Sequence, residues 1–142
     1  MEPYRYCISL RITHPYIDPN EISNVLGLKA FIQWKAGDPR INLKGVELGG
    51  LRDDSFWRYH PHDKEKISSE TRYLEDYLDD LTSSLSKNRD FFASIVNSGG
   101  HIEYDIGMFS EHNIGSVLPS QLLKRIADLN IGLSFDIYAY PE

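Results

Sequence analysis

Apolar and polar residues alternate in segments near both ends of the chain, and this pattern restricts the fold more than any other feature. Residues 5–12 read RYCISLRI, residues 102–108 read IEYDIGM and residues 133–138 read LSFDIY. A period of two places successive side chains on opposite faces of an extended chain. The three segments are therefore predicted to be β-strands, each with one buried face and one open face.

Helical patterns separate these strands. The ends of a first helix are signalled directly: Asp18 is a good N-cap, Pro19 suits the first helical position, and Gly27 is a C-terminal stop. Apolar residues spaced three and four apart predict further helices on the same principle. These helices are expected at about residues 70–86, 91–96 and 119–129.

Two more strands and a glycine-rich connection complete the first half. Segments 28–34 and 55–60 have strand character, whereas residues 37–54 contain four glycines and a proline, a composition typical of a loop or loose hairpin. The resulting order is β-α-β-β-α-β-α-β, in which the α between the third and fourth strands is split in two by a break near residues 86–88. This order fits one α+β domain over residues 1–142. We expect a single, mostly antiparallel sheet with its helices mainly on one face, a sandwich related to the ferredoxin-like fold.

This arrangement assigns the strand residues to two faces. The helices are expected to cover the face that bears Ile8, Leu10, Tyr104 and Phe135. The opposite face is expected to carry Arg5, Ser9, Arg11, Glu103, Asp105, Asp136 and Tyr138. Arginines and carboxylates on neighbouring strands can pair there. The face is interpreted either as a solvated surface or as a contact surface, with Arg11 and Asp136 as candidates for binding.

Charge and composition exclude several classes of partner. The chain has 15 basic and 21 acidic residues, a formal charge of −6 and no basic block, so we expect neither nucleic acid nor a membrane surface as a partner. The single cysteine, Cys7, excludes an internal disulfide. The sequence shows neither a secretory signal pattern nor an apolar run of about 18 residues. A cytoplasmic location is therefore expected. No catalytic motif is found either, so we expect neither a cofactor nor catalytic residues.

The stretch QWKAGDPR, residues 33–40, places a tryptophan beside a turn signal. Together with SFWRYH at residues 55–60, it brings aromatic and cationic residues to both sides of the glycine-rich connection. These residues either pin the connection to the sheet or form a recognition hot spot, in which Trp, Tyr and Arg are enriched. The candidates for a binding rim are Trp34, Lys35, Asp38, Arg40, Trp57, Arg58 and Tyr59.

His60, His62 and Asp63 are the candidates for a metal site. The two imidazoles lie on the same side of an extended chain. Zinc requires three or four ligands, and no spacing in this sequence demands a third. We therefore predict no metal and interpret these residues as a solvated loop after a strand. A metal-dependent hydrolase that uses the three side chains is an alternative function.

Four motifs occur in order along the chain: DPNEISNVLGL at 18–28, KAGD at 35–38, Trp57 in SFWRYH, and the terminal LSFDIYAY. Together they resemble the uncharacterised bacterial domain-of-unknown-function family 4279, from residue 6 to residue 140. The resemblance implies a small cytosolic bacterial α+β protein with no established catalytic residues. Some small families of this kind are immunity proteins that neutralise toxins.

The absence of a catalytic signature and the surface candidates together favour a non-enzymatic protein-binding module of the immunity or regulatory type. The alternative is a small-molecule-binding regulatory domain, whose ligand would lie between residues 37–54 and the sheet. A homodimer is compatible with either function, because an open sheet face or edge can pair with a second copy of the chain.

Overall fold

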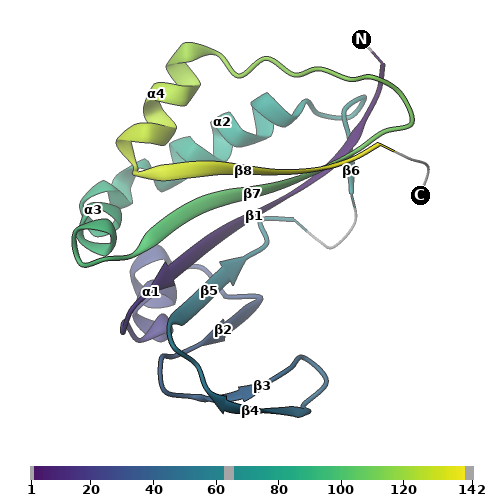
Figure 1. Ribbon diagram of the computed structural model, residues 1–142. Coiled ribbons are helices and arrows are strands. Elements are labelled where there is room, and N and C mark those ends of the chain that lie inside the picture. The colour runs from purple at the N-terminus through teal and green to yellow at the C-terminus, as the bar shows by residue number, and fades with distance from the viewer. Residues whose placement is uncertain (1, 63–65, 140–142) are drawn as a thin grey trace.

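The computed structural model describes residues 2–62 and 66–139, and it places helices against one main sheet (Figure 1). The strands are β1 (Arg5–His14), β2 (Ile32–Trp34), β3 (Pro39–Ile41), β4 (Glu47–Leu51), β5 (Ser55–Tyr59), β6 (Ile67–Ser68), β7 (His101–Phe109) and β8 (Ile131–Tyr138). The helices are α1 (Pro19–Leu26), α2 (Leu74–Leu85), α3 (Arg89–Asn97) and α4 (Ser120–Asp128), with a 3-10 turn, η1 (Ser86–Asn88), between α2 and α3.

The strands of the main sheet lie in the order β2-β5-β1-β7-β8, and β6 pairs with one end of β1. β1 is antiparallel to β5 and β7, and β5 is antiparallel to β2. β1 and β2 therefore run parallel with β5 between them, which is the split β-α-β arrangement of ferredoxin-like folds. Helix α4 then leads to β8, which is parallel to β7. The predicted α+β class, element order and mostly antiparallel sheet are confirmed.

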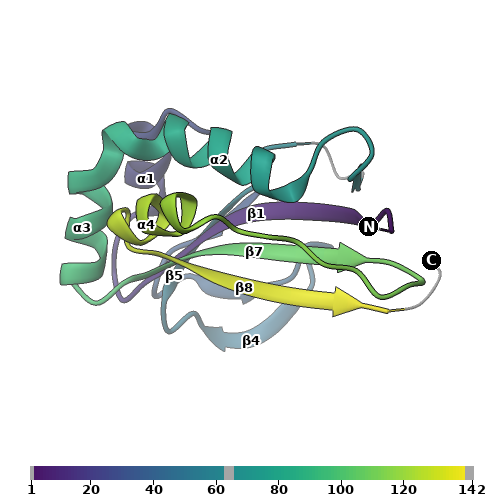
Figure 2. The same cartoon turned by 90° about the horizontal axis from the view of Figure 1, so that it is seen from above.

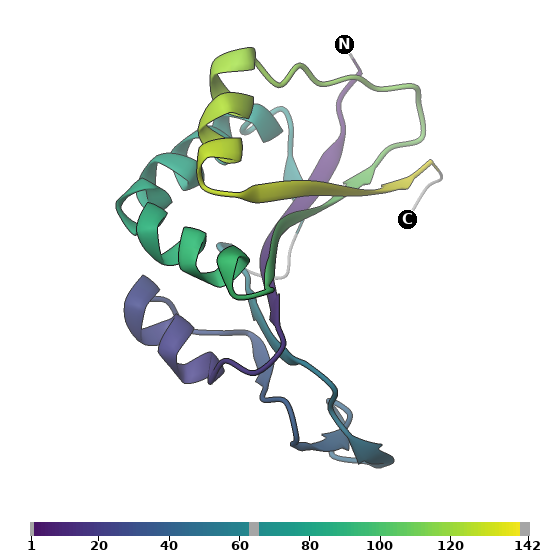
Figure 3. The same cartoon turned by 60° about the vertical axis from the view of Figure 1, so that its left-hand side comes forward.

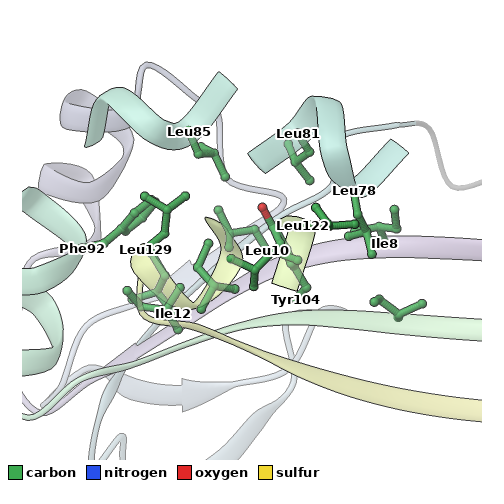
Figure 4. Packing of buried hydrophobic residues seen from close by; sticks show 14 of the residues in the cluster. Ile8, Leu10, Ile12, Leu78, Leu81, Leu85, Phe92, Tyr104, Leu122 and Leu129 are labelled. Carbon is green, nitrogen blue, oxygen red and sulfur yellow. The ribbon is translucent and has the colours of Figure 1, made fainter. Parts of the chain in front are cut away.

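The helices lie on one side of the sheet, as the view from above shows (Figure 2). Between the two layers, Ile8, Leu10 and Ile12 of β1 are buried with leucines from α2 and α4 (Figure 4). Tyr104 of β7 is also buried there, and its hydroxyl lies 2.9 Å from Thr82 Oγ1. That hydrogen bond offsets the cost of burying a polar group, and burial raises the pKa of Tyr104 to about 12.

Helix α1 has the ends that the sequence predicts. Asp18 Oδ1 accepts a hydrogen bond from the Asn20 N–H at 2.9 Å, and Gly27 ends the helix with φ at +67°. The left-handed conformation at this position favours glycine because it carries no Cβ. The predicted break after α2 is also found, since η1 (Ser86–Asn88) interrupts the helical run there.

One expectation about the covered face is wrong. Phe135 lies on the helix side of β8, yet it is 41% exposed, and Ile137 on the same side is 68% exposed. The reason is that α4 covers only the first part of β8. Ile131 at the start of β8 is buried, but the side chains become more exposed along the strand. The far half of β8 therefore presents apolar side chains to solvent.

Candidate functional site

A hairpin projects from the main sheet between β2 and β5, and residues 37–52 are termed the arm (Figure 3). In the part of the chain that the structure describes, β3 and β4 pair only with each other, so the loose-hairpin interpretation is confirmed. Every residue from Pro39 to Leu51 is exposed. The large apolar residues among them are Ile41, Leu43, Val46, Leu48 and Leu51.

One asparagine fixes the tip of the arm. Asn42 Oδ1 accepts hydrogen bonds from the N–H groups of Lys44 and Val46, both at 2.9 Å. Two backbone hydrogen bonds close the turn, from the Asn42 N–H to the Val46 carbonyl and from the Gly45 N–H to the Asn42 carbonyl, each at 3.0 Å. Gly45 has φ at +80°, which a residue with a Cβ rarely adopts. The tip therefore has a defined shape without a hydrophobic core beneath it.

The motif QWKAGDPR forms the base of the arm. The Lys35 N–H donates to Asp38 Oδ2 at 2.9 Å. The Gly37 N–H donates to the Arg52 carbonyl at 2.9 Å, and the Arg52 N–H donates to the Asp38 carbonyl at 2.8 Å. Asp38 therefore stabilises the turn, while the exposed side chains of Lys35 and Arg40 lie on the rim.

Trp34 clamps this base to the sheet. Its ring stacks on Phe56 with 4.7 Å between ring centroids, and the Arg52 guanidinium carbon lies 3.7 Å from the Trp34 centroid. Aromatic stacking and cation–π contact both stabilise such a pair of neighbours. The stack thus joins β2, β5 and the arm. The interpretation of Trp34 as a pin for the connection is confirmed, and its half-buried ring also borders the surface of the arm.

Trp57 and Tyr59 lie on the other side of β5, toward the helices. Trp57 is completely buried, and its Nε1–H donates to Ser23 Oγ at 2.9 Å. Tyr59 is half-buried and packs against the same core. Pairing of β5 with its neighbours fixes which alternate side chains face inward. Trp57 therefore belongs to the core rather than to the rim that the sequence suggested.

Charged residues on the open face of the sheet form the pairs expected from the sequence. Arg11 Nη2 lies 3.3 Å from Glu103 Oε1, and Arg11 Nη1 lies 3.6 Å from Asp105 Oδ2. Arg58 Nη2 lies 3.5 Å from the same Asp105 oxygen. Asp136 is on the same face and lines a groove of about 470 Å³ together with Arg58 and Asp105. The structure thus brings Arg11 and Arg58 together on one side of the sheet, away from the tip of the arm.

The histidine candidates make unrelated contacts. His60 stacks on Phe31 with 4.1 Å between ring centroids. His62 Nε2 accepts a hydrogen bond from the Ile8 N–H at 3.0 Å. Along this edge of β1, Ile8 lies in the gap between the residues that pair with β5 and those that pair with β6. Asp63 lies outside the described residues. Among the residues that are described, no three His, Cys, Asp or Glu side chains form a group that could hold a metal ion. The hydrolase alternative stays a prediction.

A third histidine, His14, has a structural role that the sequence did not reveal. It is 2% exposed at the end of β1, and its Nδ1 accepts from the N–H groups of Tyr16 at 3.1 Å and Ile17 at 3.0 Å. Because Nδ1 is an acceptor, the proton of the neutral ring lies on Nε2, which is 2.8 Å from Ser98 Oγ. Burial lowers the pKa of His14, and the negative charge of Glu21 opposes that change.

Sequence reasoning also missed the residues that give the arm its surface. Leu43 is 75% exposed, and Leu48 is exposed on the adjoining strand. The glycines around them indicate a turn, and a turn pattern does not show whether the aliphatic side chains between the glycines are buried or exposed. The signal that identifies them is a set of aliphatic residues in a segment too irregular to bury them.

A cleft of about 440 Å³ separates the arm from the sheet, where the small-molecule alternative places its ligand. The cleft is lined in part by Trp34, Arg40, Arg52, Asp54 and Phe56. Trp34, Phe56 and Arg52, which clamp the base of the arm to the sheet, therefore also form one wall of this cleft.

Comparisons with known proteins define the family of the chain. Searches of curated proteins and of solved structures returned no match. No helix among the described residues combines the length and apolar character that a membrane crossing requires. A family model for a domain of unknown function, DUF4279, matches residues 2–140 of the 142-residue chain. The resemblance carried by the four sequence motifs is thus confirmed, and the chain belongs to the DUF4279 family.

Proposed function

We propose that this protein is a non-enzymatic protein-binding module that contacts its partner through the arm. The observation that carries the proposal is an ordered hairpin whose residues from Pro39 to Leu51 are all exposed, including five large aliphatic ones. Apolar side chains in such a place contribute nothing to the core of the domain. Grouped exposed apolar residues on an otherwise soluble domain are typical of interaction surfaces.

The arm is already ordered before any partner arrives. Hydrogen bonds to Asn42 close its tip, and hydrogen bonds of Asp38 and Arg52 close its base. The contact between Trp34 and Arg52 holds the arm against the sheet. A preorganised loop loses less conformational entropy on binding than a flexible loop, so more of the contact energy contributes to affinity. These hydrogen bonds are therefore best explained as features that present Leu43 and its neighbours in a fixed arrangement.

The chemistry of the arm favours a protein over a lipid bilayer. Neither β3 nor β4 has a described strand partner along its outer edge, and hydrocarbon offers no hydrogen-bonding groups to the backbone there. A protein groove supplies both apolar contacts and hydrogen-bonding groups, as in strand-addition complexes. Lys35 and Arg40 at the rim would contact acidic residues of that partner. Following the family resemblance, we place this module in the bacterial cytoplasm, in an immunity or regulatory role.

The direct test is photo-cross-linking in cells that produce the protein. A benzophenone amino acid replaces Leu43 in one variant and Val117 in a control, since Val117 is 68% exposed but lies outside the arm. We expect a discrete adduct from position 43 that is absent from position 117. The adduct band should weaken when Leu48→Ser is added to the position-43 variant.

Two results would contradict the proposal. One is the absence of any adduct at position 43 while the variant remains folded by circular dichroism. The other is the same set of adducts from positions 43 and 117, because that pattern indicates non-specific contact.

A small-molecule-binding regulatory domain is the second candidate, because the cleft beside the arm is lined by Arg40 and Arg52. A thermal-shift screen of anionic metabolites tests it. A ligand whose stabilising effect disappears in Arg40→Gln would support this function, and a screen without any shift would count against it.

A further inference from the structure

The outer edge of β8 is an unpaired strand edge in the described structure. β8 is the last strand in the sheet order, and its register with β7 runs without a shift from Ile131 to Tyr138. The Ser110 N–H donates to the Tyr138 carbonyl at 3.1 Å, so the backbone groups of Tyr138 point toward β7. These groups alternate in direction along a strand. The N–H and C=O groups of Ile131, Leu133, Phe135 and Ile137 therefore point away from the sheet.

This edge lacks the features that usually prevent strands from pairing with other chains. Natural edge strands are shortened, bulged, or protected by lysine or proline. β8 has eight residues, no bulge, no lysine and no proline, and Asp136 is its only charged residue. By contrast β2, at the other edge of the sheet, has three residues. The two edges are thus open to pairing to very different degrees.

An apolar surface lies directly beside this edge. Phe135 and Ile137 are exposed on the helix side of β8 and line a groove of about 510 Å³ together with Met108 and Leu118. An edge that offers hydrogen bonds and an adjoining apolar surface has both components of a sheet-extending interface.

We propose that two copies of this chain associate through antiparallel pairing of β8 with β8, which joins their sheets into one. A two-fold axis beside Phe135 fits the outward-pointing backbone groups, because Phe135 and the partner's Phe135 would then exchange two hydrogen bonds. In this register Leu133 lies opposite the partner's Ile137, so the apolar residues of both copies meet on the helix side.

The single charge in β8 selects this register over its neighbour. With the axis beside Phe135, Asp136 lies opposite the partner's Ser134, on the open face. A shift of the axis to Asp136 would place two carboxylates directly opposite each other, which destabilises a strand pair.

The dimer leaves the arm accessible. The arm leaves the sheet between β2 and β5, whereas β8 is at the opposite edge. Two arms on one dimer would therefore contact a partner with two sites more tightly than one arm. This inference stands independently of the proposed function, since a monomer with an active arm and a dimer with an inactive arm are separate outcomes.

Sedimentation velocity over a concentration series tests the association. We expect the wild-type protein to sediment as a dimer at the higher concentrations. Ile137→Lys places a charge in the interface, and Ile137→Pro removes an N–H that β7 does not use, so both variants should sediment as folded monomers. Val117→Lys is the matched control, because Val117 has the same 68% exposure outside β8, and it should remain dimeric. A monomeric wild type, or a dimer that survives both Ile137 variants, overturns the proposal.

Disulfide cross-linking tests the register. In a Cys7→Ser background, chains carrying Ser134→Cys are mixed with chains carrying Asp136→Cys, and oxidised glutathione serves as the oxidant. Directly opposite residues of a non-hydrogen-bonded pair have Cα atoms about 4.5 Å apart, within the range of a disulfide. We expect covalent dimers from the mixture. Stronger cross-linking of Asp136→Cys chains alone would place the axis at Asp136 and overturn the register.

Discussion

The arm and the core use similar aliphatic side chains in different environments. Leu10 and Ile12 in β1 are completely buried beneath the helices, whereas Leu43 and Leu48 in the arm face solvent. The core is held mainly by the removal of apolar surface from water, which contributes about 25 cal/mol per Å². The arm is held by hydrogen bonds and one aromatic stack. Substitutions in the two regions should therefore separate stability from binding.

The largest effect on stability is expected from Trp57→Ala. This change leaves a cavity in the core and removes the hydrogen bond to Ser23, so the free energy of unfolding should fall by about 3–5 kcal/mol. Urea denaturation followed by circular dichroism measures it. Trp57→Phe keeps most of the ring volume and should cost less. A loss below about 1 kcal/mol for Trp57→Ala would show that Trp57 is not a core residue.

A second effect concerns pH and the buried His14. Because its pKa is lowered in the folded state, the unfolded chain binds a proton more readily than the folded chain as the pH falls. The stability due to the neutral ring is complete above the ordinary histidine value of 6.5 and is lost progressively as the pH falls toward the lowered folded value. Unfolding free energies measured between pH 7 and pH 5 should therefore decrease for the wild type.

His14→Asn provides the control for that pH dependence. Asparagine keeps a side-chain acceptor for the N–H groups of Tyr16 and Ile17 but does not titrate. The variant should lose the part of the pH dependence that His14 supplies. Identical pH profiles for the two proteins would contradict the assignment.

Trp34→Ala should have a smaller effect, confined to the arm. Loss of the contacts with Phe56 and Arg52 is expected to cost about 1 kcal/mol. Hydrogen exchange of the Gly37 and Arg52 amides should accelerate more than exchange in β1 and β7, because those two amides close the base of the arm. Uniform acceleration through the whole sheet would show that Trp34 supports the core.

The smallest change in stability is expected from Leu43→Ser combined with Leu48→Ser. Both side chains are exposed, so the free energy of unfolding should stay within about 0.5 kcal/mol of the wild-type value. If the arm contacts a partner, affinity for that partner should decrease in the same variant. A large loss of stability would mean that the arm packs on the domain in solution.

The main sheet was predictable from the sequence because its signals are local. Alternation in β1 and β7 matches the burial of their side chains, and Asp18 and Gly27 mark the ends of α1. The short strand β6, two residues long, carries too little pattern to be found in this way.

The candidate site was only partly predictable, because it depends on contacts between distant segments. Trp34 and Trp57 look equivalent in the sequence, and only the pairing of β2 with β5 places them on opposite faces of the sheet. Arg52 becomes part of the clamp because the hairpin returns it to Trp34. The exposure of Phe135 depends on how far α4 extends over β8, which no local pattern in β8 encodes.

The pairing of β1 with β7 also determines when the protein can fold during its synthesis. Residues from Arg5 to Thr13 find their partners between His101 and Phe109, so the first strand made gains this neighbour only after most of the chain has left the ribosome. Contacts between such distant residues slow folding, whereas the arm pairs residues close in sequence. Until β7 and then α4 emerge, β1 lacks a strand neighbour along one edge and part of the helix layer that covers its apolar face. The nascent chain would need protection from aggregation during that interval.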